Sequence, residues 1–222
     1  MVPVYGEPRV GSPADGKVHP MRLWLIRHAV TGETGTKLTG RLPGVPLSEI
    51  GHRMAADLAE KLSAQRVDAL YTSPILRCKQ TAAPLAKVWG LRADVDRGFI
   101  EADFGDWSGR SLASLRRLKA WQGLFVAPSR FRFPGGESLG EVQARSVAAV
   151  ETLADRHRNE VVAVVSHSDV IRSLVAHYLG TPLDLFQRID VAPASVSIID
   201  LPSGGFPRVP VVNTVLDVSR WR

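Results

Sequence analysis

The sequence predicts an α/β fold, a three-layer sandwich in which a mostly parallel central sheet carries helices on both faces. Two observations lead to this class. From residue 21 onward, short β-branched segments alternate with segments whose apolar residues recur at helical spacing, as is typical of a parallel sheet. The last two predicted strands are joined by the short turn PSGGF, which favours a hairpin and therefore an antiparallel edge strand.

Six segments are short, β-branched and apolar enough to form strands, namely residues 22–26, 67–72, 91–96, 160–166, 194–201 and 208–218. Between them, three apolar stripes predict helices that each bury one face. The stripes consist of Ile50, Met54, Leu58 and Leu62; of Leu139, Val142, Ser146, Val150 and Leu153; and of Val170, Ile171, Leu174, Val175 and Tyr178. A further helix is expected directly after the second strand, with Ser73 as its cap and Pro74 in its first position.

The 222 residues suit one domain with a substantial core. Residues 1–20 contain several Pro and Gly and no apolar periodicity, so we expect a flexible N-terminal extension followed by a single domain over residues 21–222. Within that domain, residues 108–136 are expected to form a lid over the strand ends. Their interleaved cationic and aromatic residues would admit a leaving group with a second negative charge, or else form a solvated amphipathic helix and a hydrophobic loop.

The composition limits the partners of the chain. A formal net charge of +6 favours an anionic partner, but no run of five or more Lys and Arg occurs, so we expect no nucleic-acid partner. No apolar run approaches the roughly 18 residues of a membrane span, and no membrane partner is expected. The single cysteine, Cys78, excludes an internal disulfide and agrees with a cytoplasmic location. The edge strand at residues 208–218 would permit two copies to pair as a homodimer.

Histidines and arginines follow the ends of three predicted strands. Arg27 and His28 follow the first, Arg77 lies in the helix after the second, and His167 follows the fourth. Open parallel sheets bind ligands beyond the carboxyl ends of their strands. Guanidinium groups offer forked donors, and a helix N-terminus such as that at Ser168 adds free N–H groups. We therefore expect these residues to bind a phosphate.

Five motifs occur in a fixed order: LIRHA at 25–29, YTSPILRCKQTA at 71–82, EADFGDWSG at 101–109, GGES at 135–138 and VVSHSDVIRSLV at 164–175. Together they resemble the histidine phosphatase superfamily, in the branch that also holds the cofactor-dependent phosphoglycerate mutases, over roughly residues 21–218. The resemblance implies that His28 is the nucleophile and that Arg27 and Arg77 bind the phosphate. It also implies that His167 is the second histidine of the pocket and that Glu101 donates the proton.

The chemistry of a phosphate monoester agrees with these roles. Its negative oxygens repel a nucleophile, so cations must neutralise them while the nucleophile is held in line. The two neighbouring arginines would keep His28 as the neutral imidazole that attacks, and a phosphohistidine would form. Glu101 would protonate the leaving group and then activate water, although Asp103 and Asp106 are alternatives for that role. The steps need no metal and no other cofactor, so we expect neither.

Two departures from the family pattern concern phosphate binding. Ala29 and Val30 replace the Gly-Glu that usually follows the nucleophile, and the pocket Asn about ten residues later is absent. Its substitute is one of Thr31, Thr36, Lys37 or Arg41, and we include Arg41 among the predicted substrate-binding residues, which are Arg27, Arg77, His167, Ser168 and Arg41.

The motifs favour a hydrolase of a small phosphorylated metabolite. EADFGDWSG and GGES look like the phosphatase branch, and the longer Tyr-Gly-rich insertion of the glycolytic mutases is not found. A phosphoglycerate mutase-type transferase and a non-enzymatic phospho-ligand-binding module are the alternatives. A cysteine-based phosphatase is not expected, because Pro84 stands six residues after Cys78 where that class needs an arginine.

Overall fold

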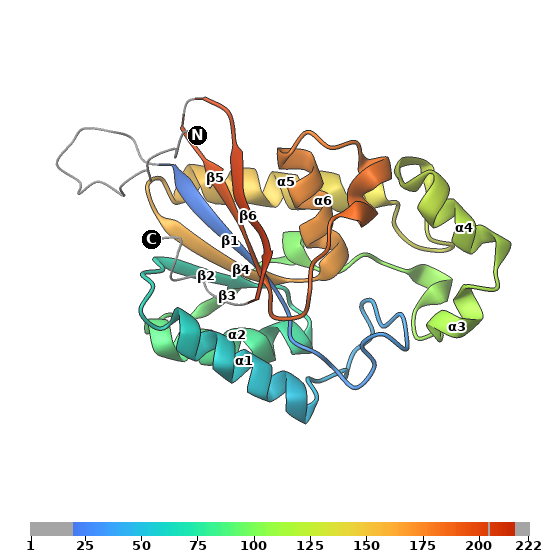
Figure 1. Cartoon of the computed structure of the whole chain (residues 1–222), viewed down its shortest axis with the longest axis horizontal. Helices are drawn as coiled ribbons and strands as arrows, with labels where there is room; N and C mark the ends of the chain where they lie inside the picture. The colour runs from blue at the N-terminus through green and yellow to red at the C-terminus, as the bar shows by residue number, and fades with distance from the viewer. Residues whose placement is uncertain (1–19, 204, 216–222) are drawn as a thin grey trace, which may run out of the picture.

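A twisted sheet forms the centre of the computed structural model, which describes residues 20–203 and 205–215 (Figure 1). Within these residues the sheet has six strands in the order β3-β2-β4-β1-β5-β6. The strands are β1 (Met21–Arg27), β2 (Ala69–Thr72), β3 (Ala93–Val95), β4 (Val161–Ser166), β5 (Val196–Leu201) and β6 (Arg208–Thr214). The predicted N-terminal extension, apart from Pro20, and the predicted strand residues 216–218 lie outside the described residues.

The first four strands pair in parallel, which confirms the predicted fold class. The predicted antiparallel hairpin at the sheet edge is also present: β5 and β6 pair antiparallel, and β6 is the edge strand. β5 runs antiparallel to β1 as well, a direction that the sequence pattern did not specify. The hairpin then turns the chain once more, so β6 has the direction of β1.

Two helices cover each face of the sheet. Helices α1 (Glu49–Leu62) and α2 (Leu76–Trp89) pack on one face, and α5 (Leu139–Arg156) and α6 (Ser168–Tyr178) pack on the other (Figure 1). β1 serves both cores because successive side chains of a strand point to opposite faces. Leu23 and Leu25 join the core beneath α5 and α6, whereas Trp24 and Ile26 join the core above α1 and α2. Residues 23–26 of this central strand are therefore all apolar.

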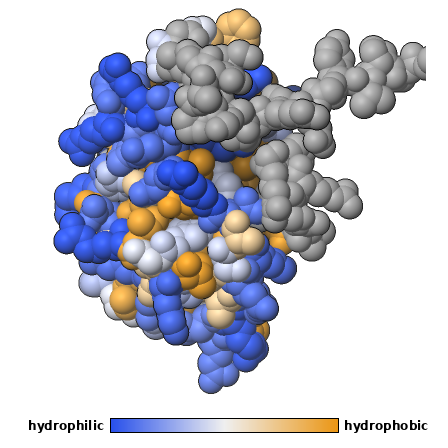
Figure 2. All heavy atoms as spheres, turned by 90° about the vertical axis from the view of Figure 1, so that its left-hand side faces the viewer, coloured by the Kyte–Doolittle hydropathy of each residue, from blue (hydrophilic) through white to orange (hydrophobic). Residues whose placement is uncertain are grey.

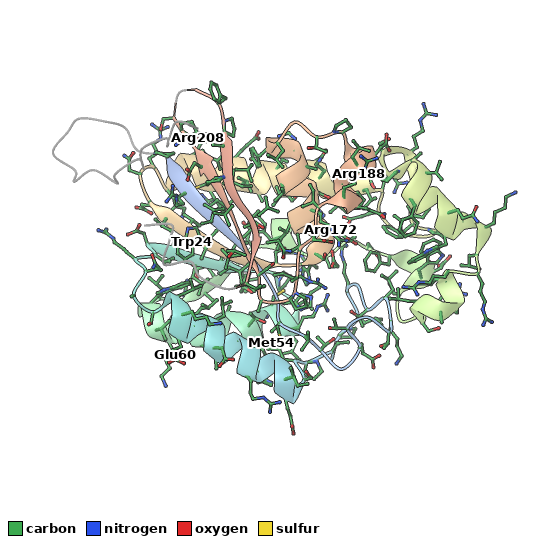
Figure 3. All side chains as sticks on the ribbon, viewed as in Figure 1. Trp24, Met54, Glu60, Arg172, Arg188 and Arg208 are labelled. Atoms are coloured by element: carbon green, nitrogen blue, oxygen red, sulfur yellow. The ribbon has the colours of Figure 1, made fainter. Side chains whose placement is uncertain are left out.

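The apolar stripes predict the helices closely. All five stripe residues of α5 are buried, and Ser138 caps the helix in a capping box with Glu141. In α1 the buried face is rotated slightly from the prediction: Ile50 is 57% exposed, and Gly51 and Ala55 are buried instead. Glu60 lies on the outer side of α1 (Figure 3).

The start of α2 differs from the prediction. The helix begins at Leu76, with Ile75 in the capping position, rather than at Pro74 with Ser73 as the cap. The backbone N–H of Ser73 still donates to the carbonyl of Val165 in the neighbouring strand, 2.9 Å away. Because Ser73 is bonded alongside β4, the chain is extended there and the helix can only start two residues later.

Residues 108–136 contain two short helices, α3 (Leu112–Leu115) and α4 (Lys119–Val126), on the side of the molecule toward which β1 points (Figure 1). Trp107, Trp121, Phe131 and Phe133 pack against one another, with ring centroids 5.1–5.7 Å apart. The cationic residues of the segment, Arg110, Arg116, Arg117, Lys119, Arg130 and Arg132, are exposed. These aromatic residues thus extend the core that lies beneath α5 and α6. Closure of this segment over a substrate stays a prediction.

The end of the molecule where β1 begins presents mainly hydrophilic side chains around small apolar areas (Figure 2). None of the described helices is long and apolar enough to cross a bilayer.

Candidate active site

Backbone hydrogen bonds fix Arg27 and His28 at the carboxyl end of β1. The N–H of Arg27 donates to Ser195 on one side, and the N–H of His28 donates to Ser166, the last residue of β4, on the other. These bonds hold the chain between two strands just where its side chains reach the rim of the sheet. The sequence delivers both residues there because an apolar strand precedes them and a loop follows.

The hydrogen bonds of the His28 ring define its tautomer. Nδ1 lies 2.8 Å from the carbonyl oxygen of Ala29, which can only accept, so Nδ1 carries the hydrogen. Nε2 therefore keeps its lone pair, and the Nε–H of Arg77 donates to it across 3.1 Å. Burial, followed by the charges of Arg77 and Arg27, lowers the pKa of His28 to about 3. The ring is a neutral imidazole with its free nitrogen turned toward the arginine.

Arg77, the second residue of α2, is only 2% exposed. One terminal nitrogen donates to the carbonyl of Gly40 at 2.9 Å and lies 3.1 Å from Nδ1 of His167. The other terminal nitrogen is buried without a hydrogen-bond partner among the described residues, and so is Nε of Arg27. Buried donors are rarely left unpaired. Two guanidinium groups therefore offer donors that suit an anion such as phosphate.

His167 caps α6 and is fully buried. Because the guanidinium of Arg77 can only donate, Nδ1 of His167 accepts, and Nε2 donates to the hydroxyl of Ser73 across 2.8 Å. Burial and the charge of Arg77 hold the pKa of His167 well below its usual range. Its ring lies 5.2 Å from that of His28, centroid to centroid. In this arrangement His167 is neutral, and a bound phosphate dianion would favour its protonation.

Glu101 follows a 3-10 turn after β3 and is 7% exposed. One carboxyl oxygen accepts from the N–H of Ala102 at 2.9 Å, and the other lies 3.9 Å from Nδ1 of His167. Burial and then the charge of Asp169 raise the pKa of Glu101 to about 7, although the two arginines oppose the shift. A carboxyl with this pKa holds a proton near neutrality and can give it away.

The alternative acids lie outside this cluster. Asp103 accepts from the N–H of Gly105 and lies 3.5 Å from a guanidinium nitrogen of Arg41, and Asp106 is exposed. The geometry therefore favours Glu101 over both.

The model of the histidine phosphatase superfamily (branch 1) matches residues 23–214. The chain belongs to the histidine phosphatase superfamily. It is 33% identical over 189 residues to phosphoserine phosphatase 1 of Hydrogenobacter thermophilus, covering 82% of this chain and 87% of that protein. It is 31% identical over 182 residues to phosphoglycerate mutase-like protein 4 of Arabidopsis thaliana, covering 75% and 79%.

Solved structures of the superfamily share the fold. A mycobacterial glucosyl-3-phosphoglycerate phosphatase superposes with a TM-score of 0.79 at 26% identity, covering 87% of this chain and 99% of that one. YhfR of Bacillus stearothermophilus superposes with a TM-score of 0.80 at 31% identity, covering 86% and 96%. The relatives thus include proteins named as phosphatases and proteins named as mutase-like.

The structure brings together Arg27, His28, Arg77, His167 and Glu101. The other two predicted substrate-binding residues, Ser168 and Arg41, differ from each other in position. Ser168 is half-buried at the first turn of α6, directly after His167. Arg41 turns its guanidinium to carboxylates: one terminal nitrogen is 2.8 Å from Glu137, and the other is 3.5 Å from Asp103. Substrate binding by Ser168 and by Arg41 stays a prediction.

Three residues around the site were not predicted to take part in it. Ser73 accepts from His167, and Gly40 accepts from Arg77. The sulfur of Cys78 lies 3.4 Å from Nε2 of His167, and burial raises the pKa of this thiol to about 12, so it stays protonated. Ser73 could have been found from its place directly after β2; nothing in the sequence indicates the contacts of Gly40 and Cys78.

Asp169 and Arg172 of α6 complete the charges around Arg27. Burial raises the pKa of Asp169, and Arg172 lies 3.5 Å from its carboxylate and donates to the carbonyl of Ile189 (Figure 3). Among the described residues, no group of three or more His, Cys, Asp and Glu is arranged to hold a metal ion.

Proposed function

We propose that this member of the histidine phosphatase superfamily is a phosphomonoester hydrolase that acts on a small phosphorylated metabolite through a phosphohistidine on His28. The observation that carries the proposal is the lone pair on Nε2 of the neutral His28 ring, which lies beside two guanidinium groups. Among the described residues, each of these groups has a buried nitrogen without a hydrogen-bond partner. A neutral nucleophile beside cations is what attack on an anionic ester requires.

In the first step, phosphate oxygens take the free donors of Arg27 and Arg77. Nε2 of His28 attacks the phosphorus, and the bond from phosphorus to the leaving oxygen breaks as the new bond to nitrogen forms. Glu101 gives its proton to the leaving oxygen, so the product departs as an alcohol. The two guanidinium groups compensate the charge that the equatorial oxygens carry throughout.

In the second step, the carboxylate of Glu101 takes a proton from water as the water attacks the phosphohistidine. The phosphorus–nitrogen bond breaks, its electrons return to Nε2, and inorganic phosphate leaves. His28 is again neutral and Glu101 again protonated, so the cycle closes without any group outside the chain other than substrate and water.

Hydrolysis is favoured over mutase chemistry by the names of the relatives. Phosphoserine phosphatase 1 and the glucosyl-3-phosphoglycerate phosphatase are both named for removal of a phosphate. The mutase-like relative keeps phosphoryl transfer as the second candidate.

The test measures inorganic phosphate released from p-nitrophenyl phosphate, phosphoserine and 3-phosphoglycerate, in the presence of a chelator. We expect the wild-type enzyme to release phosphate and His28→Ala to release none above background. Transfer of the phosphoryl group between glycerate positions without release would support the mutase instead. Binding of these esters with neither release nor transfer would overturn an enzymatic role.

A further inference from the structure

Three charged side chains from distant parts of the chain meet beside Glu101, and they form a network that we call the brace: Arg41, Glu137 and Arg145. Glu137 belongs to the GGES motif, Arg145 to α5 and Arg41 to the loop before α1. The brace touches Glu101 through its backbone and not through its carboxyl group. The brace is therefore distinct from Arg27 and Arg77, the guanidinium groups that would contact the phosphate.

Both arginines donate to the same acceptor, the backbone carbonyl oxygen of Glu101. Nε of Arg41 lies 2.8 Å from that oxygen, and a terminal nitrogen of Arg145 lies 3.2 Å from it. Arg145 also donates to the carbonyl of Gly98 at 2.8 Å, at the start of the same turn. Two forked cations thus clamp the short segment that presents the Glu101 carboxyl to the site.

The carboxylate of Glu137 holds the two arginines together. Its two oxygens each lie 3.1 Å from a different nitrogen of Arg145, and one of them lies 2.8 Å from Arg41. The same oxygen accepts from the backbone N–H of Asp103 at 3.1 Å. Burial would raise the pKa of Glu137, but the bonds from Arg145 outweigh it and the pKa is lowered, so this carboxylate is charged near neutrality.

The remaining links join the two loops directly. The N–H of Glu137 donates to the carbonyl of Asp103 at 3.0 Å, so the GGES turn and the Glu101 loop are bonded backbone to backbone. A methyl group on Gly136 would lie 2.2 Å from that carbonyl oxygen, which leaves no space for a side chain between the loops. The loops are in close contact, and the brace adds bonds from both of them to Arg145 of α5 and to the loop of Arg41.

We propose that Arg41, Glu137 and Arg145 are positioning residues for the proton transfer by Glu101. This inference rests on the proposed function. The Glu101 carboxyl is bonded to the N–H of Ala102 in its own loop, so a shift of the loop moves the proton away from the leaving oxygen. A displacement of about 1 Å costs on the order of a hundredfold in rate. Arg41 thereby acts on the loop, although the sequence placed it at the substrate.

The test uses Glu137→Gln, which keeps the shape of the side chain and removes the charge that joins the arginines. Proton donation matters most for a poor leaving group and least for a good one. The readout is kcat/KM, because it reports formation of the phosphohistidine, whereas the later attack of water is common to both esters and enters only kcat. We expect kcat/KM for phosphoserine, an alkyl ester, to fall about tenfold or more, and kcat/KM for p-nitrophenyl phosphate, whose phenolate leaves readily, to fall less than about threefold.

Glu141→Gln is the matched control. Glu141 lies four residues after Glu137, and this substitution removes its ion pair with Arg132. Glutamine at this position can still serve in the capping box of α5. Its kcat/KM should equal that of the wild type on both esters. Arg41→Lys is the second variant, because lysine keeps the charge and loses the fork: it should show the same selective loss as Glu137→Gln.

The possible outcomes separate the brace from its alternatives. A selective loss on the alkyl ester in Glu137→Gln and Arg41→Lys supports the brace. An equal loss on both esters, or none, overturns it, and a rise in KM for both esters in Arg41→Lys would place Arg41 at the substrate instead. If the wild-type enzyme hydrolyses neither ester while Glu141→Gln and the wild type unfold alike, the proposed function itself fails, and with it the brace.

Discussion

At the scale of single residues, the site depends on two ionisable groups whose protonation differs from the usual one. Burial and the neighbouring arginines lower the pKa of His28 to about 3, so its ring stays uncharged down to a pH far below 7. Burial shifts the pKa of Glu101 in the opposite direction, up to about 7. Burial disfavours the charged form of both groups, and this gives a free nucleophile and a protonated acid at the same pH.

This difference predicts the pH dependence. Glu101 is protonated below a pH of about 7 and loses its proton above it, so kcat/KM should fall as the pH rises through that value. His28 should add no acidic limb between about pH 4 and 7, because it stays neutral there. Glu101→Gln should lower kcat for an alkyl phosphate by about 10²–10⁴-fold and abolish the alkaline limb. The check is a set of pH–rate profiles for the wild type and this variant.

Asp103→Asn is the control for the Glu101 assignment. It removes the other carboxylate of the same loop, so its profile should keep the alkaline limb of the wild type. If the limb survived in Glu101→Gln and vanished in Asp103→Asn, Asp103 would be the acid.

At the scale of elements, the start of α1 supports the loop that follows His28. The N–H of Ser48 and its hydroxyl both bond to the carbonyl of Val30, and the same hydroxyl accepts from the N–H of Gly51. The helix approaches so closely that a methyl group on Gly51 would lie 2.0 Å from that carbonyl oxygen. The backbone of Gly51 is helical, so any residue could adopt its conformation. Glycine is required there because a side chain would collide with the loop.

Gly51→Ala should therefore destabilise the protein by about 1–3 kcal/mol, because helix and loop must separate. It should also reduce kcat, since Val30 lies two residues after His28. Gly140→Ala is the matched control: it lies in the first turn of α5 with open space around it, and the nearest atom would be 3.9 Å away. That change should be neutral or slightly stabilising. Urea unfolding measures both variants, and equal stabilities would contradict the packing explanation.

At the scale of the whole molecule, alternation of apolar segments was enough to predict the sheet, because strands and helices each follow a short sequence period. The same pattern located Arg27, His28 and His167 at strand ends, since each directly follows an apolar strand. The direction of β5 and the late start of α2 were not predicted. Both depend on pairing with a neighbouring strand, which no local pattern encodes.

The surroundings of the site were the least predictable part. The hydrogen bonds from Arg41 and Arg145 to Glu101 join residues 60 and 44 positions apart, and they exist only after the loops have packed. An arginine near the phosphate-binding motifs is a natural candidate for binding the phosphate. The structure shows instead that Arg41 pairs with the carboxylates of Glu137 and Asp103. Arg41 and Arg145 lie outside the five motifs, and the position of Glu137 within GGES does not indicate which residues it contacts.

Two features of the edge strand β6 make it less suited to the predicted pairing of two copies. β6 contains Pro210, which has no N–H to offer a partner strand, and its pairing with β5 is irregular. A homodimer through this edge stays a prediction of the sequence alone.

The most direct measurement is to stop the reaction during turnover of p-nitrophenyl phosphate and to locate the bound phosphoryl group by mass spectrometry of the digested protein. We predict an acid-labile phosphoryl group on the peptide that contains His28, absent from His28→Ala and accumulating in Glu101→Gln, where water is not activated. A phosphoryl group on any other residue, or rapid phosphate release with no phosphorylated protein at any time, would contradict nucleophilic catalysis by His28.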